Sequence, residues 1–80
     1  IASCPVEPAL IFREVSLRNA LRVILIHNHP SGDPHPSQAD IQLTYRISEA
    51  GEVMGIQVLD HLIIGDSRFV SFQESGLLND

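Results

Sequence analysis

The sequence of 80 residues is poor in several residue types, and each shortage excludes a class of structure. It has one cysteine, Cys4, which excludes an internal disulfide and a zinc site built from several cysteines. Its apolar runs, such as residues 23–26, are far shorter than the ~20 residues that cross a bilayer. The chain does not open with a basic segment and a long apolar stretch, as a signal peptide would. These features predict a cytoplasmic protein.

Lysine is absent, and the net charge is -5. The only basic residues besides histidine are scattered arginines: Arg13, Arg18, Arg22, Arg46 and Arg68. Nucleic-acid binding requires clustered positive charge that neutralises phosphates. The composition therefore argues against direct binding of DNA or RNA.

A hydrophobic share of 44% indicates a folded chain, and the length allows one small domain. Proline is favoured in the first turn of a helix, so we predict a helix from Pro8 to about Arg22. Residues 23–26 are apolar without interruption and rich in β-branched side chains. This pattern predicts a strand that is buried on both faces in the middle of a sheet.

The segment HNHPSGDPHP, residues 27–36, predicts a loop because it combines three prolines, a glycine and an aspartate. A second helix is expected to begin at Ser37 and to end at Gly55, where glycine favours the left-handed backbone of a helix end. Residues 56–64 and 68–72 read as a hairpin of two strands. The order helix, strand, helix, strand, strand predicts an α/β fold with a mixed sheet.

Two histidines and a carboxylate carry the strongest chemical pattern. His27 and His29 directly follow the first strand, and side chains two residues apart in an extended segment point the same way. Asp40 lies in the first turn of the next helix, which the rigid loop can turn toward the end of the strand. Two imidazoles and one carboxylate leave one tetrahedral position for water, as catalytic zinc sites do. We therefore predict a Zn2+ site made by His27, His29 and Asp40.

A structural interpretation competes for two of these residues. Ser37-x-x-Asp40 is also a capping box, in which the serine side chain accepts the Asp40 N–H and the carboxylate reaches back. Ser37 can serve both interpretations, because its backbone can start the helix while its hydroxyl faces the metal. For Asp40, a carboxylate on zinc is less free to cap, so we expect one role to dominate.

The motif HNHPSGDPHPSQAD resembles that of the RadC family, bacterial proteins of the JAMM (MPN-plus) metalloprotease superfamily. The resemblance also covers FREVSLRNALRVILIHNHPSGDP and EAGEVMGIQVLDHLIIGDSRFVSFQESGLL, which is nearly the whole chain. It implies that His27, His29 and Asp40 bind zinc, and that Ser37 is catalytic through a hydrogen bond to the developing oxyanion. The implied fold is a cytidine-deaminase-like α/β/α sandwich. The implied substrate is a peptide or isopeptide, and RadC proteins also carry a DNA-repair label.

The chain departs from the family motif in one respect. The family places a glutamate, the general base, on a strand that precedes the stretch matching Ile1. No glutamate present has a matching strand position: Glu7, Glu14, Glu49, Glu52 and Glu74. We therefore assign no general base and interpret residues 1–80 as the C-terminal part of a single domain whose first strands are missing. The alternatives are a non-catalytic interaction module and a DNA-repair-associated protein.

Five other residues could carry chemistry, but each has a simpler interpretation. His35 could be a spare ligand, yet a solvated loop histidine explains it. Asp60 and His61 are adjacent in a strand and should face opposite sides, so structural roles are expected for both. Cys4 could be a nucleophile, but no partner residue is positioned to activate it. Asn28 is expected to stabilise the turn.

Overall fold

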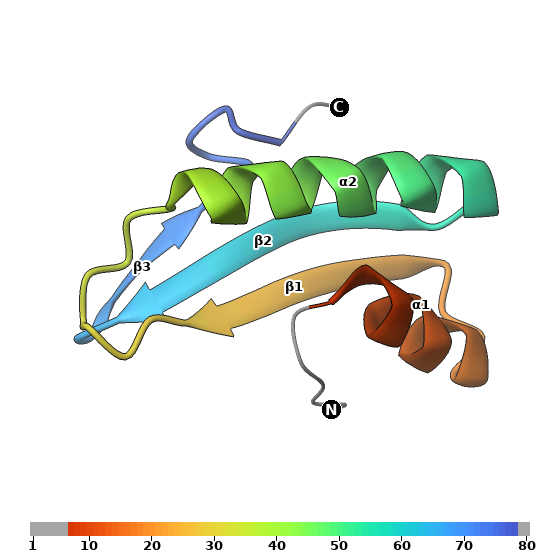
Figure 1. The fold of residues 1–80 in the computed structure, drawn as a ribbon, viewed down its shortest axis with the longest axis horizontal. Coiled ribbons are helices and arrows are strands. Elements are labelled where there is room, and N and C mark those ends of the chain that lie inside the picture. Colours follow the sequence, from red (N-terminus) through yellow and green to blue (C-terminus); the bar gives the residue numbers. More distant parts are fainter. Residues whose placement is uncertain (1–6, 79–80) are drawn as a thin grey trace.

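The computed structural model describes residues 7–78. The elements follow the order α1 (Pro8–Leu17), β1 (Arg22–Asn28), α2 (Gln38–Met54), β2 (Gln57–Gly65) and β3 (Arg68–Ser71), as Figure 1 shows. In the sheet β2 is central, parallel to β1 and antiparallel to β3. The α/β class and the mixed sheet are thus confirmed. Within the described residues, no helix has the length and apolar character needed to cross a membrane.

The apolar core lies between the helices and one face of the sheet. Its buried residues are Ile11 and Val15 of α1, Ile47 of α2, and Ile56 just before β2. Partly buried residues of the strands pack against this cluster, among them Val23, Leu25 and Val58. Each buried side chain of this kind contributes about 1.5–3 kcal/mol to folding. Both helices therefore cover the same face of the sheet.

The prediction that β1 is buried on both faces is wrong for the described residues. Burial alternates along the strand, and Ile24 and Ile26 are 53% and 64% exposed. Ile64 of β2 and Phe69 of β3 are also exposed. The reason is that both described helices pack on the opposite face, so the described residues form two layers, one of helices and one of sheet.

The predicted first helix is too long at its C-terminal end, because α1 stops at Leu17. Asn19 has a positive φ of 54°, which asparagine tolerates better than most residues. The N–H of Asn19 donates to the carbonyl of Ser16, and the N–H of Ala20 donates to that of Val15. This pair of bonds is the Schellman arrangement, with asparagine in the usual place of glycine.

The central strand β2 contains an irregularity that sets which side chains face the helices. Val23 pairs with Val58, but Ile24 pairs with Asp60, so Leu59 is an extra residue. Beyond this bulge His61 and Ile63 face the helices and are 1% and 0% exposed. The bulge thus brings a histidine into the interior beside β1.

The loop after β1 is fixed to the hairpin of β2 and β3. The N–H of His29 donates to the carbonyl of Ile64. Gly65 approaches the loop so closely that a Cβ there would lie 2.5 Å from the carbonyl oxygen of Gly32. At the turn itself, Asp66 and Ser67 both adopt positive φ angles, which aspartate tolerates locally. The loop therefore rests on a backbone contact that only glycine permits.

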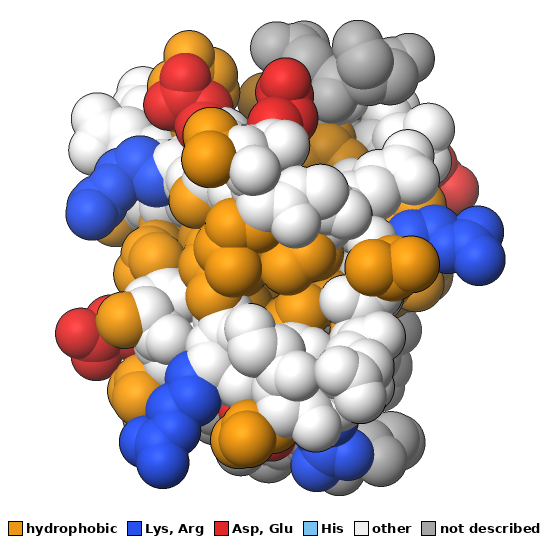
Figure 2. Space-filling view, turned by 90° about the vertical axis from the view of Figure 1, so that its right-hand side faces the viewer, with side chains coloured by type: hydrophobic (Ala, Val, Ile, Leu, Met, Phe, Trp, Pro, Cys, Tyr) orange, Lys and Arg blue, Asp and Glu red, His pale blue; other side chains and the backbone are white. Residues whose placement is uncertain are grey.

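The opposite end of the molecule is apolar. It is formed by the C-terminal ends of α1 and α2 and by the start of β1. Figure 2 shows apolar side chains at the centre of this face, bordered mainly by other side chains and backbone, with charged side chains toward the edge and no histidine in view. Several large apolar side chains of these segments are exposed: Leu17, Leu21, Val53 and Met54. The chain therefore has an apolar end and, at the carboxyl end of β1, a histidine-rich one.

Candidate metal centre

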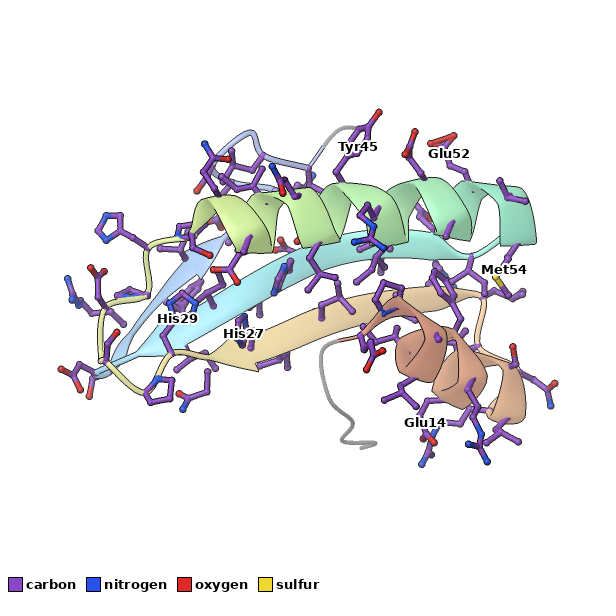
Figure 3. All side chains as sticks on the ribbon, in the orientation of Figure 1. Glu14, His27, His29, Tyr45, Glu52 and Met54 are labelled. Atoms are coloured by element: carbon purple, nitrogen blue, oxygen red, sulfur yellow. The ribbon has the colours of Figure 1, made fainter. Side chains whose placement is uncertain are left out.

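Two of the predicted ligands lie at the carboxyl end of β1. His27 belongs to the face of the strand that the helices cover, and His29 follows two residues later at the start of the loop. Their ring centroids are 4.8 Å apart, and the rings are nearly perpendicular. Their side chains are 25% and 17% exposed, so both rings are partly shielded from water. The predicted convergence of the two imidazoles is present in the structure (Figure 3).

The third predicted ligand, Asp40, is buried in the first turn of α2. Its Oδ2 lies 3.0 Å from Nε2 of His29, and its Oδ1 lies 3.5 Å from Nδ1 of His27. One candidate ligand atom from each of the three residues lies within 4.8 Å of the other two. The structure therefore brings together the three side chains that the sequence singled out, and this group could bind a metal ion.

Ser37 and Asp40 form the capping box as well. The N–H of Asp40 donates to Oγ of Ser37 at 3.1 Å, and the N–H of Ser37 donates to Oδ2 of Asp40 at 2.8 Å. We expected one role of Asp40 to dominate, but the carboxylate divides its oxygens. Oδ2 completes the box and contacts His29, while Oδ1 faces His27. The cap thus fixes the carboxylate with an oxygen directed at each histidine.

The environment of Asp40 favours its charged form. Burial acts to raise the pKa of this carboxyl, but the backbone N–H and the side chain of Ser37 act to lower it. The neighbouring imidazoles of His27 and His29 lower it further, because a positive charge on either ring would favour the carboxylate. The net result is an Asp40 pKa below its ordinary value, so the group is a carboxylate at neutral pH.

The loop holds His29 in one orientation. Nδ1 of His29 lies 2.9 Å from the backbone carbonyl oxygen of Asp33. Metal-binding histidines commonly donate their second ring N–H to such a carbonyl, which orients the ring and fixes the tautomer. His35 lies outside the cluster: its ring is 76% exposed and bonds the Asp33 carboxylate at 2.6 Å. The interpretation of His35 as a solvated loop histidine is confirmed.

Asp60 has the structural role expected of it. Its carboxylate accepts the N–H groups of His61 and Gln73 and the hydroxyl of Ser71. Burial acts to raise the pKa of Asp60, but these hydrogen bonds lower it below its ordinary value. The Asp60 side chain therefore ties the bulge in β2 to the end of β3 and to the segment after it, and it makes no bond to the His61 ring.

Sequence reasoning missed the neighbours of the cluster, His61 and Thr44. His61 stacks on His27 with centroids 5.9 Å apart, and Thr44 contacts Nδ1 of His61 at 2.6 Å. No sequence signal pointed to this contact, because the bulge at Leu59 reverses the facing that regular alternation predicts. Cys4 lies outside the described residues. No glutamate of residues 7–78 belongs to the cluster.

Comparison with known proteins assigns the chain that carries this cluster to a family. The family model of the RadC-like JAB domain matches residues 1–77. The chain belongs to the RadC-like JAB family. Its site therefore lies in a domain of the JAMM/MPN type, in agreement with the resemblance of the HNHPSGDPHPSQAD segment.

Relatives of this RadC-like domain are longer proteins. A UPF0758 protein of Moorella thermoacetica is 58% identical over 72 residues, which cover 90% of this chain and 31% of the relative. UPF0758 proteins of Geobacter sulfurreducens and Desulfitobacterium hafniense are 55% and 53% identical over 73 residues, 91% of this chain and 32% of each relative. The RadC-like chain therefore spans about a third of the length of these relatives.

Proposed function

We propose that this domain is a zinc-dependent hydrolase of the peptidase or isopeptidase type, with His27, His29 and Asp40 as the ligands. The observation that carries the proposal is the convergence of these three side chains within 4.8 Å. Two imidazoles and a carboxylate are the ligand set of catalytic zinc sites that keep an open position. Structural zinc sites instead use four protein ligands, so the cluster fits a catalytic site better.

Two polar atoms of the cluster favour a bound cation. Nδ1 of His27 is buried and has no hydrogen-bond partner among the described residues. Nδ1 of His29 faces a carbonyl oxygen, so the ring proton belongs on that nitrogen. Nε2 of neutral His29 then directs a lone pair at Oδ2 of Asp40, 3.0 Å away. Two acceptors this close favour a shared proton or cation, and zinc accepts both an imidazole nitrogen and a carboxylate oxygen, which supports the proposal.

The residues of the chain then have distinct roles. A bound zinc ion would polarise a substrate carbonyl and lower the pKa of its water toward ~7. Asp33 orients His29 through its backbone carbonyl, and the capping box orients Asp40. Ser37 also carries a hydroxyl proton that can be donated to a developing oxyanion, a type of stabilisation that often dominates catalysis. We assign no general base among residues 7–78.

Metal analysis tests this proposal. The protein, refolded with zinc and dialysed, is expected to retain about one equivalent of metal, and His27→Ala is expected to retain almost none. His35→Ala is the matched control, because His35 belongs to the same loop but lies outside the cluster. A metal content below about a tenth of an equivalent in the unmodified protein, or an unchanged content in His27→Ala, would contradict the proposal.

A second candidate is a non-catalytic module in which the zinc site only stabilises the fold or serves as a docking site for a partner. The observation that favours it is the lack of a glutamate near the cluster in residues 7–78. An assay with a library of peptides and isopeptides distinguishes the hydrolase from the module. It compares this chain with a version extended to the length of its relatives. Zinc-dependent cleavage by the extended version supports the hydrolase, and bound zinc without cleavage by either supports the module. The scattered arginines among ten acidic residues make direct DNA binding the weakest candidate.

A further inference from the structure

A row of stacked rings lies behind the candidate metal centre. His61 is fully buried in β2, between β1 and β3 in the sheet. Its ring centroid is 5.9 Å from that of His27, with an interplanar angle of 21°. Phe72, directly after β3, stacks on His61 at 4.5 Å. The ring of His61 therefore limits how the ring of His27 can turn.

A second contact ties His61 to the helix that carries Asp40. Thr44 lies one turn beyond Asp40 in α2 and is 1% exposed. Its hydroxyl donates to the backbone carbonyl of Asp40 at 2.8 Å. Because the single hydroxyl proton is used there, the contact of Oγ with Nδ1 of His61 at 2.6 Å has the ring N–H as donor.

The bond to Thr44 is the polar anchor of the His61 ring. Nε2 of His61 is buried and has no partner within residues 7–78, so Thr44 and the stacked rings alone hold this side chain. Thr44 thus joins the turn that presents Asp40 to the ring that borders His27. Residues of this kind, one contact away from the ligands, commonly set ligand orientation and metal affinity.

We propose that Thr44 and His61 are positioning residues that hold Asp40 and His27 at metal-binding distance from one another. The proposal rests on the function proposed above, because it names residues that act on the same site. Neither side chain would contact the ion or the substrate. The spacing of Asp40 and His27 would then depend on this hydroxyl and this ring as well as on the direct contact between the two residues.

Substitutions of Thr44 test the proposal in the full chain. Thr44→Val keeps the shape but removes the hydroxyl, and we expect zinc affinity, measured by chelator competition, to fall by roughly 10–100-fold. The visible absorption spectrum of the Co2+-loaded protein is expected to change, since it reports ligand geometry. Thr44→Ser restores the hydroxyl and is expected to restore affinity and spectrum. Ile47→Val is the matched control: it lowers thermal stability three residues further along α2 and leaves affinity and spectrum unchanged.

Two further measurements keep every outcome decisive. If Thr44→Val does not fold, His61→Phe keeps a stacking ring without Nδ1 and is expected to weaken zinc binding to a similar extent. If the unmodified protein binds no zinc, the proposed function fails, and imidazole nitrogen NMR of the metal-free protein then tests positioning alone. Shifts of the His27 ring signals in Thr44→Val, but not in Thr44→Ser or Ile47→Val, support the proposal. Unchanged signals, or unchanged affinity and Co2+ spectrum in Thr44→Val, overturn it.

Discussion

The two ends of β1 differ in what holds them. At the amino end, Val23 and Leu25 pack against an apolar cluster, where close packing supplies the free energy of folding. At the carboxyl end, the strand leads into two histidines whose neighbours are a carboxylate, a backbone carbonyl and the ring of a third histidine. Buried polar groups of this kind contribute little net stability, and they lower it when a partner is missing. One end of β1 therefore stabilises the fold, while the other holds a pre-arranged set of candidate metal ligands.

The separation is not complete, because α2 serves both ends. Asp40 and Thr44 belong to its first turns and face the histidines, whereas Ile47 belongs to the core. A substitution early in α2 should therefore alter metal binding, and one later should alter stability. The predictions below test this division in order of decreasing effect on stability.

Ile47→Ala should have the largest effect on stability. The side chain is fully buried, and its truncation is expected to lower the free energy of unfolding by about 2–5 kcal/mol. Urea unfolding followed by circular dichroism measures this loss. Zinc bound per folded molecule should stay unchanged. A loss below about 1 kcal/mol would show that the cluster is not the main source of stability.

Acid should destabilise the metal-free protein through His61. Burial, followed by the charge of His27, lowers the pKa of His61 from 6.5 to about 4. The unfolded chain therefore binds the proton first as the pH falls below 6.5. The stability present above pH 6.5 should be lost toward pH 4, by about 3 kcal/mol in all.

The measurement is a series of urea unfolding curves between pH 7 and pH 4 in the presence of a chelator. His61→Gln should flatten the dependence in this range. The lowered pKa values of Asp40 and Asp60 act in a lower window, since their stabilisation is present above pH 3.8 and lost below it. An unchanged slope in His61→Gln would assign the proton uptake to another group.

Gly65→Ala should disturb the histidine end. The added Cβ would lie 2.5 Å from the carbonyl oxygen of Gly32, so the loop that carries His29 must move. We expect a loss of about 1–3 kcal/mol in stability together with weaker zinc binding. Gly55→Ala is the matched control, at the C-terminal end of α2 away from the histidines. Alanine is strained at its φ of 73°, but no atom lies within 4 Å of the new Cβ. Equal effects of the two variants on zinc affinity would contradict the proposed coupling of loop and site.

Ser37→Ala should have the smallest effect on stability. It removes the cap of α2 and is expected to cost about 1 kcal/mol in urea unfolding. Ser37→Thr retains a capping hydroxyl and should recover most of the loss. Zinc content should remain near that of the unmodified protein, although Ser37 lies at the start of α2, because the substitution keeps the backbone N–H of Ser37 that donates to Oδ2 of Asp40. A loss of zinc in Ser37→Ala alone would show that the Ser37 hydroxyl is also required to hold Asp40.

The sequence allowed the order of the elements and the three converging side chains to be predicted. His27 and His29 share a face through strand geometry, and the Ser37–Asp40 box marks the start of α2, so local rules sufficed. It did not reveal the exposed face of β1. Residues 23–26 are all apolar, so the pattern is the same on both faces of the strand, and which face is buried depends on where the helices pack. The Schellman end at Asn19 was missed because the apolar residues that follow resemble a continuing helix. The contact of Thr44 with His61 depends on tertiary pairing that no local rule gives.

The bulge at Leu59 has a consequence for how the length of this chain can vary. Val58 and His61 are three positions apart and would face opposite sides in a regular strand. Both face the helices because the extra residue, Leu59, shifts the alternation by one. A deletion of Leu59 would leave a regular ladder in which Val58, His61 and Ile63 keep their sides. A deletion of Leu62 would instead turn every later residue of β2 to the opposite side and place Ile63 in solvent. Variation in length should therefore be tolerated before His61 and not after it.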